Sequence, residues 1–229
     1  MPLQRRQRTT LLIRVKESKI KVILNGVDGL TPVSTDEKRI IKERFNLPDG
    51  YKAVSIVARL EDIKGHDYFI EAADRLLQKG IKARFYIAGT GSYENHLKEK
   101  VKNMNRQEQI IFTGFISDVD KLMSITDVQA NASFGTEATS LALLEGMSLG
   151  IPAVVSDFGG NPGVIKNGQN GYIVPKQNSK ALADNLEVLL TDQKLYDYMS
   201  QGAKKIFRKT FTAQAMTKQT EQVYLDLMK

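Results

Sequence analysis

Two cations follow the first strongly β-branched run of this sequence, in the loop that leads out of it. Arg59 and Lys64 stand five residues apart after the run Ala53–Ala58. A guanidinium can grip two phosphate oxygens through its planar fork, and an ammonium adds a compact, mobile charge, so the two together suit a diphosphate. The alternative is a solvated loop in which Arg59 forms a surface ion pair with Glu61 or Asp62.

Two carboxylates follow a second such run, Val128–Ala132. Thr139 and Ser140 are good N-cap residues, so we predict a helix that begins near them and offers its first-turn N–H groups to an anion. Glu137 would then lie in the loop and Glu145 in the helix, and eight helical residues would span about 12 Å, close to the length of a nucleoside diphosphate sugar. Glu145 stands among apolar residues, and we expect it to have a partner because an unpaired buried charge is costly. The alternative for Glu145 is a partly exposed helix edge.

Glycine pairs follow two further β-branched runs. Gly89 and Gly91 come after Arg84–Ala88, and Gly159 and Gly160 come soon after another. Such glycines let the backbone turn sharply or come close to a ligand. A third glycine of the dinucleotide fingerprint is missing at the first pair, which argues against a nicotinamide site.

Short β-branched runs alternate with stretches of helical period, which is typical of a parallel sheet built from βαβ units. We therefore predict an α/β fold, a doubly wound parallel sheet with a helical C-terminus. The expected strands are Lys21–Leu24, Ala53–Ala58, Arg84–Ala88, Gln109–Thr113, Val128–Ala132, Ala153–Ser156 and Tyr172–Val174. The expected helices include His66–Gln78, Glu94–Met104, Lys180–Leu190, Gln193–Arg208 and Ala213–Met228.

Composition narrows the classes of protein that remain. The chain has 229 residues, 41% hydrophobic and 26% charged, and no apolar run approaches the roughly 20 residues of a membrane span. It has no cysteine and two histidines, which excludes a disulfide framework, a Cys-ligated zinc site and a multi-histidine metal cluster. The lack of cysteine fits a reducing compartment, so we expect a cytoplasmic location, with peripheral contact to a membrane left open.

The net charge of +7 is concentrated at the N-terminus, where residues 1–24 carry seven basic side chains and one acidic side chain. Such a leader could contact acidic lipid or another polyanion, and the alternative is a solvated or foreign terminus. Nucleic-acid binding through residues 1–21 would show a steep salt dependence. We expect the chain not to bind nucleic acid.

The motifs together resemble the C-terminal half of the family-4 retaining glycosyltransferases. The resemblance covers residues 18–229 and rests on order and spacing. Its carriers are Asn25-Gly26-Val27-Asp28, Ala58-Arg59-Leu60 through Lys64-Gly65, Gly89-Thr90-Gly91, Glu137 with Glu145, Gly150-Ile151-Pro152 and Asn170-Gly171.

The resemblance implies a GT-B fold, in which two Rossmann-like lobes face each other and the C-terminal lobe binds a nucleotide-diphospho-sugar. By motif position Arg59 and Lys64 would neutralise the donor diphosphate, Glu137 would contact the donor sugar, and Glu145 would bind the ribose hydroxyls. Catalysis is thereby assigned to Glu137, Arg59 and Lys64. Neither a cofactor nor a metal ion is expected. The remaining donor-binding positions are Gly89, Gly91, Thr139, Ser140 and Leu141.

The implied function is hexosyl transfer to a glycan or lipid-linked acceptor, with retention, in polysaccharide biosynthesis. We expect residues 1–18 to be a basic leader or the remnant of an interlobe helix, and residues 19–229 to be the donor-binding domain. The acceptor-binding lobe would be missing or a separate subunit, so activity alone would be poor. The last helix would expose Val223, Tyr224 and Leu227 and invite self-association.

A second hypothesis is a noncatalytic nucleotide-sugar binding or assembly module. It rests on Ala138 and Ser140, which stand where the family usually has glycine, and on Gly163, which replaces a glutamate.

Overall fold

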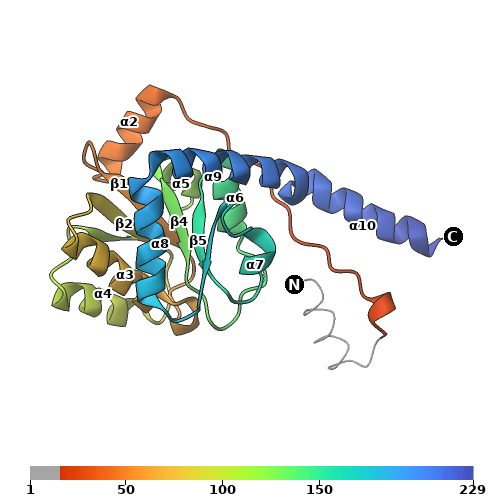
Figure 1. Ribbon diagram of the computed structural model, residues 1–229, viewed down its shortest axis with the longest axis horizontal. Coiled ribbons are helices and arrows are strands. Elements are labelled where there is room, and N and C mark those ends of the chain that lie inside the picture. Colours follow the sequence, from red (N-terminus) through yellow and green to blue (C-terminus); the bar gives the residue numbers. More distant parts are fainter. Residues whose placement is uncertain (1–15, 229) are drawn as a thin grey trace.

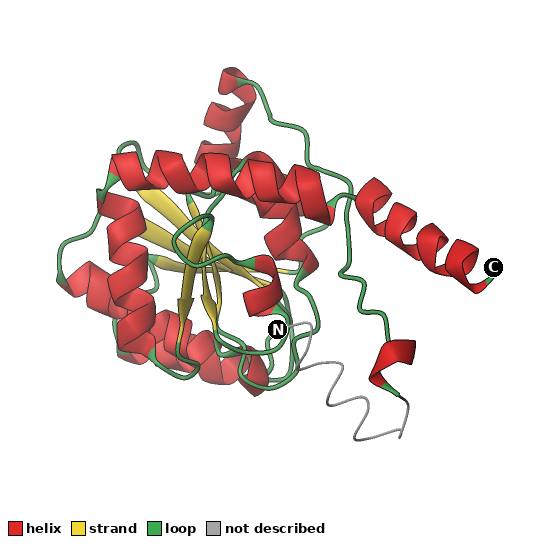
Figure 2. Cartoon of the chain, turned by 45° about the vertical axis from the view of Figure 1, so that its right-hand side comes forward, coloured by secondary structure: helices red, strands yellow, loops and turns green. Residues whose placement is uncertain are grey.

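The computed structural model describes residues 16–228 and shows one six-stranded parallel sheet between two layers of helices (Figures 1 and 2). The strand order is β3-β2-β1-β4-β5-β6, and every neighbouring pair is parallel. This order belongs to the doubly wound dinucleotide-binding folds and confirms the predicted fold class. The strands are β1 (Lys52–Val57), β2 (Ala83–Ala88), β3 (Ile110–Gly114), β4 (Val128–Asn131), β5 (Ala153–Ser156) and β6 (Gly171–Val174).

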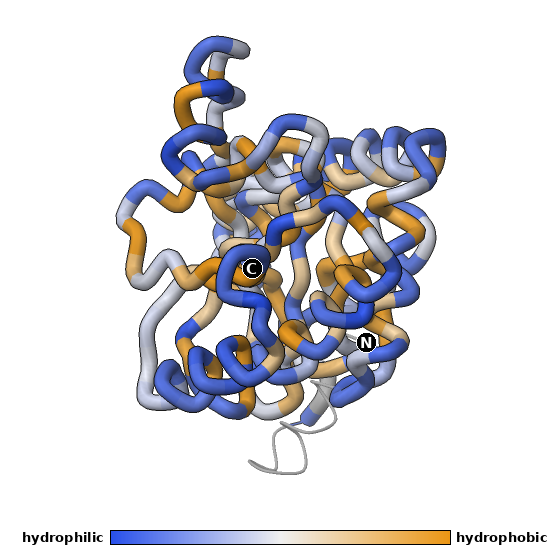
Figure 3. The backbone as a smooth tube through the Cα atoms, turned by 90° about the vertical axis from the view of Figure 1, so that its left-hand side faces the viewer, coloured by the Kyte–Doolittle hydropathy of each residue, from blue (hydrophilic) through white to orange (hydrophobic). Residues whose placement is uncertain are grey.

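The strands are short and apolar because helices cover both faces of the sheet. All four residues of β4 and of β5 are buried, as are the four central residues of β1. Parallel sheets are usually covered in this way, so their strands read as continuous apolar runs without alternation. Figure 3 shows the result, since hydrophobic positions gather inside the fold and hydrophilic ones on the outer turns.

Helices alternate between the two faces of the sheet. Val54 and Ile56 of β1 pack in a core shared with α3, α4 and α8, whereas Ala53 packs in a second core with α2 and α5. A third core joins β5 to α6, α9 and the turn η3. The helices are α2 (Thr35–Arg44), α3 (His66–Gln78), α4 (Glu94–Asn103), α5 (Val119–Ile125), α6 (Leu141–Leu149), α7 (Asn161–Val164), α8 (Ser179–Thr191), α9 (Gln193–Ile206) and α10 (Ala213–Leu227), with the short turns η1 (Glu17–Lys19), η2 (Asp62–Lys64) and η3 (Phe207–Phe211).

The predicted strand Lys21–Leu24 is wrong, because these residues form no strand. They belong to an irregular segment that crosses η3 instead of joining the sheet. Its one β-bridge joins Val27 to Thr212, and the amide of Val27 donates to the carbonyl of Phe211 at 3.0 Å. Half-buried apolar side chains therefore pack on a helical turn, an arrangement that an apolar run cannot distinguish from a sheet edge.

The C-terminal elements match the three predicted helices, with one interruption. Between α9 and α10 the chain makes the π-helical turn η3, whose Phe207 and Phe211 are buried. Helix α10 then leaves the body of the domain and projects into solvent (Figure 1). It has no buried residue, and Tyr224 and Leu227 are exposed by 66% and 79%. The expected exposure is therefore confirmed for Tyr224 and Leu227 and is wrong for Val223, which is half-buried.

Of the predicted leader, residues 1–15 lie outside the described chain. No helix in the range 16–228 is both long enough and apolar enough to span a lipid bilayer.

Candidate active site

The centre of the sheet brings together the two loops that the sequence marked with charge. Strands β1 and β4 are neighbours, with Val54 opposite Val128, and the strand order reverses between them. The connections after these two strands lead to opposite sides, which opens a crevice at their carboxyl ends. Lys64 follows β1 and Glu137 follows β4.

Lys64 and Glu137 form an ion pair that is largely hidden from solvent. The Nζ of Lys64 lies 3.2 Å from Oε2 of Glu137, and their side chains are 12% and 8% exposed. The same ammonium donates to the carbonyl of Thr136 at 2.8 Å. An ammonium has three N–H donors, and these contacts use two of them. The structure thus joins two predicted site residues that lie 73 positions apart in the sequence.

Further polar groups hold the carboxylate of Glu137. Its Oε2 accepts from the hydroxyl of Ser133 at 3.1 Å and from the amide of Asn131 at 3.4 Å. The Oδ1 of Asn131 in turn accepts from the side chain of Asn161 at 3.2 Å. The backbone also contributes, since the amide of Gly160 donates to the carbonyl of Glu137 at 2.9 Å. Buried networks of this kind orient the group at their centre.

Helix α6 begins at Leu141, with Ser140 as its N-cap, so the predicted start is confirmed. The hydroxyl of Ser140 accepts from the amide of Leu143 at 3.4 Å. Within the described chain no capping bond reaches the amides of Leu141 and Ala142, so both remain donors at the helix N-terminus. The segment from Glu137 to Ser140 is not helical, so a helical rise over eight residues does not describe the spacing of Glu137 and Glu145.

Glu145 lies on α6 and is half-buried. Burial raises the pKa of its carboxyl group, and the negative charge of Asp120 adds to the shift. Across residues 16–228 its side chain has neither an ion pair nor a hydrogen bond, so the expectation of a partner is wrong. Glu145 is thus a carboxyl group with unused hydrogen-bonding capacity.

Arg59 lies on the exposed side of the same loop. Its side chain is 70% exposed, and Nη1 lies 2.6 Å from Oε1 of Glu61. The surface ion pair that we considered as the alternative is therefore present. Arg59 thus pairs with Glu61 at the surface, whereas Lys64 is buried against Glu137. That the two cations share a diphosphate stays a prediction.

Gly89 and Gly91 are needed where the loop after β2 passes the loop after β1. A Cβ on Gly89, whose φ is +136°, would lie 2.1 Å from the carbonyl oxygen of Ala58. A Cβ on Gly91 would lie 2.2 Å from that of Leu60. No larger residue fits at either position without a shift of the backbone, so these glycines allow the two loops to pass this close to each other.

A cavity of about 260 Å³ lies beside Arg59, at the carboxyl ends of β1 and β2. Phe115, which is 78% exposed, forms its most exposed wall and was not predicted from the sequence. An aromatic residue directly after β3 was the signal that could have identified it. The lining residues are Val57, Ala58, Arg59, Ala88, Gly89, Thr90, Phe115, Ile116 and Val119.

His66 opens α3, two residues after Lys64, and is 1% exposed. Neither ring nitrogen has a hydrogen-bond partner among the described residues. Burial lowers the pKa of His66 to about 4, with a smaller contribution from the charge of Lys64. The ring is therefore neutral at pH 7 and adds no positive charge beside Lys64.

The part of the chain from 16 to 228 contains no cluster of three or more His, Cys, Asp or Glu side chains that could hold a metal ion. That donor binding needs no metal stays a prediction.

Comparison with known proteins identifies the family. The profile of the family Glycosyl transferases group 1 matches residues 37–206, most of the chain, so the chain belongs to this family. The predicted family is confirmed.

Individual relatives agree with this result. The chain is 28% identical to the Escherichia coli UDP-Gal:alpha-D-GlcNAc-diphosphoundecaprenol alpha-1,3-galactosyltransferase, over 93% of this chain and 56% of that protein. It superimposes on a glycosyltransferase from Rickettsia africae with a TM-score of 0.89 at 22% identity, over 98% of this chain and 62% of that one. The Anabaena protein HepE, solved with UDP-glucose, gives a TM-score of 0.86 at 20% identity, over 96% and 61%. The chain spans about half the length of the curated relatives it matches.

Proposed function

We propose that this chain is the donor-binding lobe of a retaining glycosyltransferase that moves a hexosyl group from a nucleotide-diphospho-sugar to a glycan or lipid-linked acceptor. The observation that carries the proposal is the buried pair of Lys64 and Glu137 at the point where the strand order reverses. In open α/β sheets ligands bind in that crevice. The Escherichia coli relative is named for a UDP-galactose donor and a lipid-linked acceptor, which agrees with this assignment.

Lys64 would stabilise the leaving diphosphate. Breaking the anomeric C–O bond leaves an oxocarbenium-like sugar and a diphosphate whose negative charge grows. The third N–H of Lys64 and the amides of Leu141 and Ala142 are donors that can meet this charge. Arg59 has an exposed guanidinium on the same loop, and it can leave Glu61 for a phosphate at little cost, because exposed ion pairs are weak.

The two carboxylates would hold the ends of the donor. Glu137 is fixed by Ser133 and Asn131, so its position suits hydrogen bonds to sugar hydroxyls. Glu145 has no partner in the described chain and a raised pKa, and a diol is a neutral partner for it. The cavity beside Arg59 would take the nucleobase between its apolar walls and Phe115.

Turnover would depend on an acceptor-binding lobe, on the same polypeptide or a separate subunit. We place the reaction in the cytoplasm, on the basis of the cysteine-free composition.

Calorimetry with UDP-, GDP- and ADP-sugars tests donor binding by the chain. We expect one nucleotide class to bind, and Lys64→Met to weaken it at least about tenfold, since a hydrogen bond to a charged group contributes about 1.5–3 kcal/mol. Lys82→Met removes an exposed lysine before β2, at the opposite edge of the sheet, and should bind as the parent does. Equal affinity for Lys64→Met, in a variant shown to be folded by circular dichroism, would remove Lys64 from the site.

Turnover separates the enzyme from the noncatalytic module. The chain is mixed with the acceptor-binding lobe of a relative, and release of nucleoside diphosphate is followed. Release that is lost in Lys64→Met supports the transferase, whereas tight binding without release supports the binding module.

A further inference from the structure

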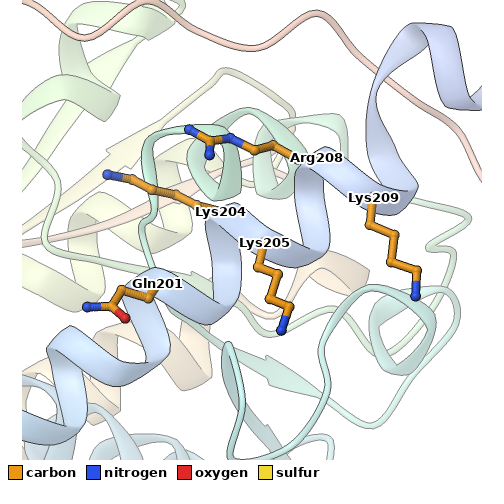
Figure 4. Close-up of a pocket in the computed structure, with 5 residues that line it drawn as sticks. All are labelled: Gln201, Lys204, Lys205, Arg208 and Lys209. Atoms are coloured by element: carbon orange, nitrogen blue, oxygen red, sulfur yellow. The ribbon is translucent and has the colours of Figure 1, made fainter.

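A cluster of cations lies at the junction of α9 and η3. Lys204, Lys205, Arg208 and Lys209 line a shallow depression of about 520 Å³ together with Gln201. Lys204 and Arg208 extend to one side of the helical segment, and Lys205 and Lys209 extend to the other (Figure 4). We call these four residues the α9 cationic cluster.

The charge of the α9 cationic cluster is not neutralised. Within residues 16–228 none of its members forms an ion pair, in contrast to Lys79, Lys100 and Lys121, which all do. No acidic residue occurs between Tyr198 and Thr220 in the sequence. Like charges four positions apart on a helix repel each other, and the cluster contains two such pairs. Ion pairing within the fold therefore does not account for the cluster.

An apolar crevice of about 500 Å³ borders the same segment. Ile206, which lines it and is half-buried, stands between members of the cluster in the sequence, so the crevice adjoins the cations on one helical segment. Lys166 adds a further exposed cation to the lining. The other lining residues are Val22, Leu24, Gly159, Gly160, Pro162, Gly163, Thr210 and Phe211.

We propose that the α9 cationic cluster and this crevice form a docking surface for an anionic lipid bilayer. Clustered lysine and arginine side chains attract the negative surface of such a membrane, and an adjoining apolar face can enter the boundary between headgroups and acyl chains. A single-stranded nucleic acid fits less well, because sites for it combine cations with exposed aromatic rings. The aromatic residues of this segment, Phe207 and Phe211, are buried.

The α9 cationic cluster shares no residue with the candidate active site, so its test does not depend on the proposed transferase function. The crevice does reach the site at Gly160, whose amide donates to the carbonyl of Glu137. It would hold the domain at a membrane without a spanning helix.

Co-sedimentation of the full chain with vesicles tests the proposal. Vesicles of phosphatidylcholine with 30 mol% phosphatidylglycerol should bind the chain, and pure phosphatidylcholine vesicles should not. The quadruple variant Lys204→Gln, Lys205→Gln, Arg208→Gln and Lys209→Gln keeps good helix formers and should lose at least about tenfold in partitioning. Circular dichroism confirms its fold.

Two control variants separate the cluster from the total charge and from the leader. The first changes four exposed lysines outside the cluster to glutamine, and thereby removes the same net charge: Lys38, Lys82, Lys102 and Lys194. The second changes Arg5, Arg6, Arg8 and Arg14 to glutamine. Both should keep binding that depends on the α9 cationic cluster.

Several outcomes would overturn the proposal. They are no binding to anionic vesicles, an equal loss in the first control, loss of all binding in the second control, or preferential binding of a single-stranded RNA oligonucleotide through the same four residues.

Discussion

The buried pair of Lys64 and Glu137 allows a prediction whose size follows from the structure. Changing Lys64 to methionine removes the ammonium from the carboxylate of Glu137, which is 8% exposed, while Ser133 and Asn131 still donate to it. Breaking a buried pair costs about 3–5 kcal/mol, and the remaining donors offset part of this, so we expect a loss of about 3 kcal/mol in the free energy of unfolding. For a domain of this size the melting temperature would fall by about 6–12 °C.

A double-mutant cycle isolates the interaction itself. Lys64→Met, Glu137→Gln and the double variant are unfolded in urea, and their free energies of unfolding are compared with the parent. The double variant removes both charges together, so it should be about 2 kcal/mol more stable than the sum of the single losses predicts. Losses that add to within about 0.5 kcal/mol would show that the two charges do not interact, and would refute the site built on them.

The exposed pair of Lys79 and Glu187 is the matched control for this cycle. Their side chains are 48% and 31% exposed. Exposed pairs contribute little because water and salt screen them, so the same cycle there should give a coupling well below that of the buried pair.

Three further predictions follow from the same structure. Because burial lowers the pKa of His66 to about 4, the unfolded chain takes up its proton first as the pH falls from about 6.5, and stability is lost down to about pH 4. Between pH 7 and pH 4.5 the parent should lose about 2–3 kcal/mol more of its free energy of unfolding than His66→Leu does, as measured by urea titration. Parallel pH profiles of the two proteins would contradict the assignment. Glu145→Gln should raise the melting temperature at pH 7, since it removes a half-buried charge, yet weaken nucleotide binding in calorimetry; a lower melting temperature would show that the charge has a partner. Finally, the parent chain should self-associate through α10, and the double variant Tyr224→Ser, Leu227→Ser should be monomeric in sedimentation velocity. A monomeric parent would contradict this prediction.

The sequence was a good guide to the sheet because its strands are buried on both faces. Runs such as Ala53–Ala58 and Ala153–Ser156 are apolar without alternation and end in glycine, aspartate or charged loops, so their existence and order could be predicted. The prediction of a strand at Lys21–Leu24 was wrong because the same apolar pattern occurs outside the sheet. A short apolar segment packs equally well on the turn η3, and only the backbone hydrogen bonds of Val27 show which surface it uses.

Local chemistry at the site was predictable where it depends on neighbouring residues. Ser140 caps α6 by accepting a hydrogen bond from the amide three residues later, and this short separation can be read from the sequence. The partners of Glu145 and Arg59 were not predictable in this way. Glu145 has no side-chain partner in the described chain, and Arg59 pairs with its near neighbour Glu61. These outcomes depend on burial and side-chain reach, which are set by elements that lie elsewhere in the sequence.

The sequence by itself determined the alternation of strands and helices, the family, and which residue types follow each strand, since these depend on short-range pattern. Only the tertiary structure decided that Lys64 pairs with Glu137, 73 residues away, and that Phe115 lines a cavity beside Arg59. It also decided that α10 leaves the body of the domain. The physical reason is the order of the strands: parallel pairing places β1 next to β4, so loops that are distant in the chain meet at one edge of the sheet.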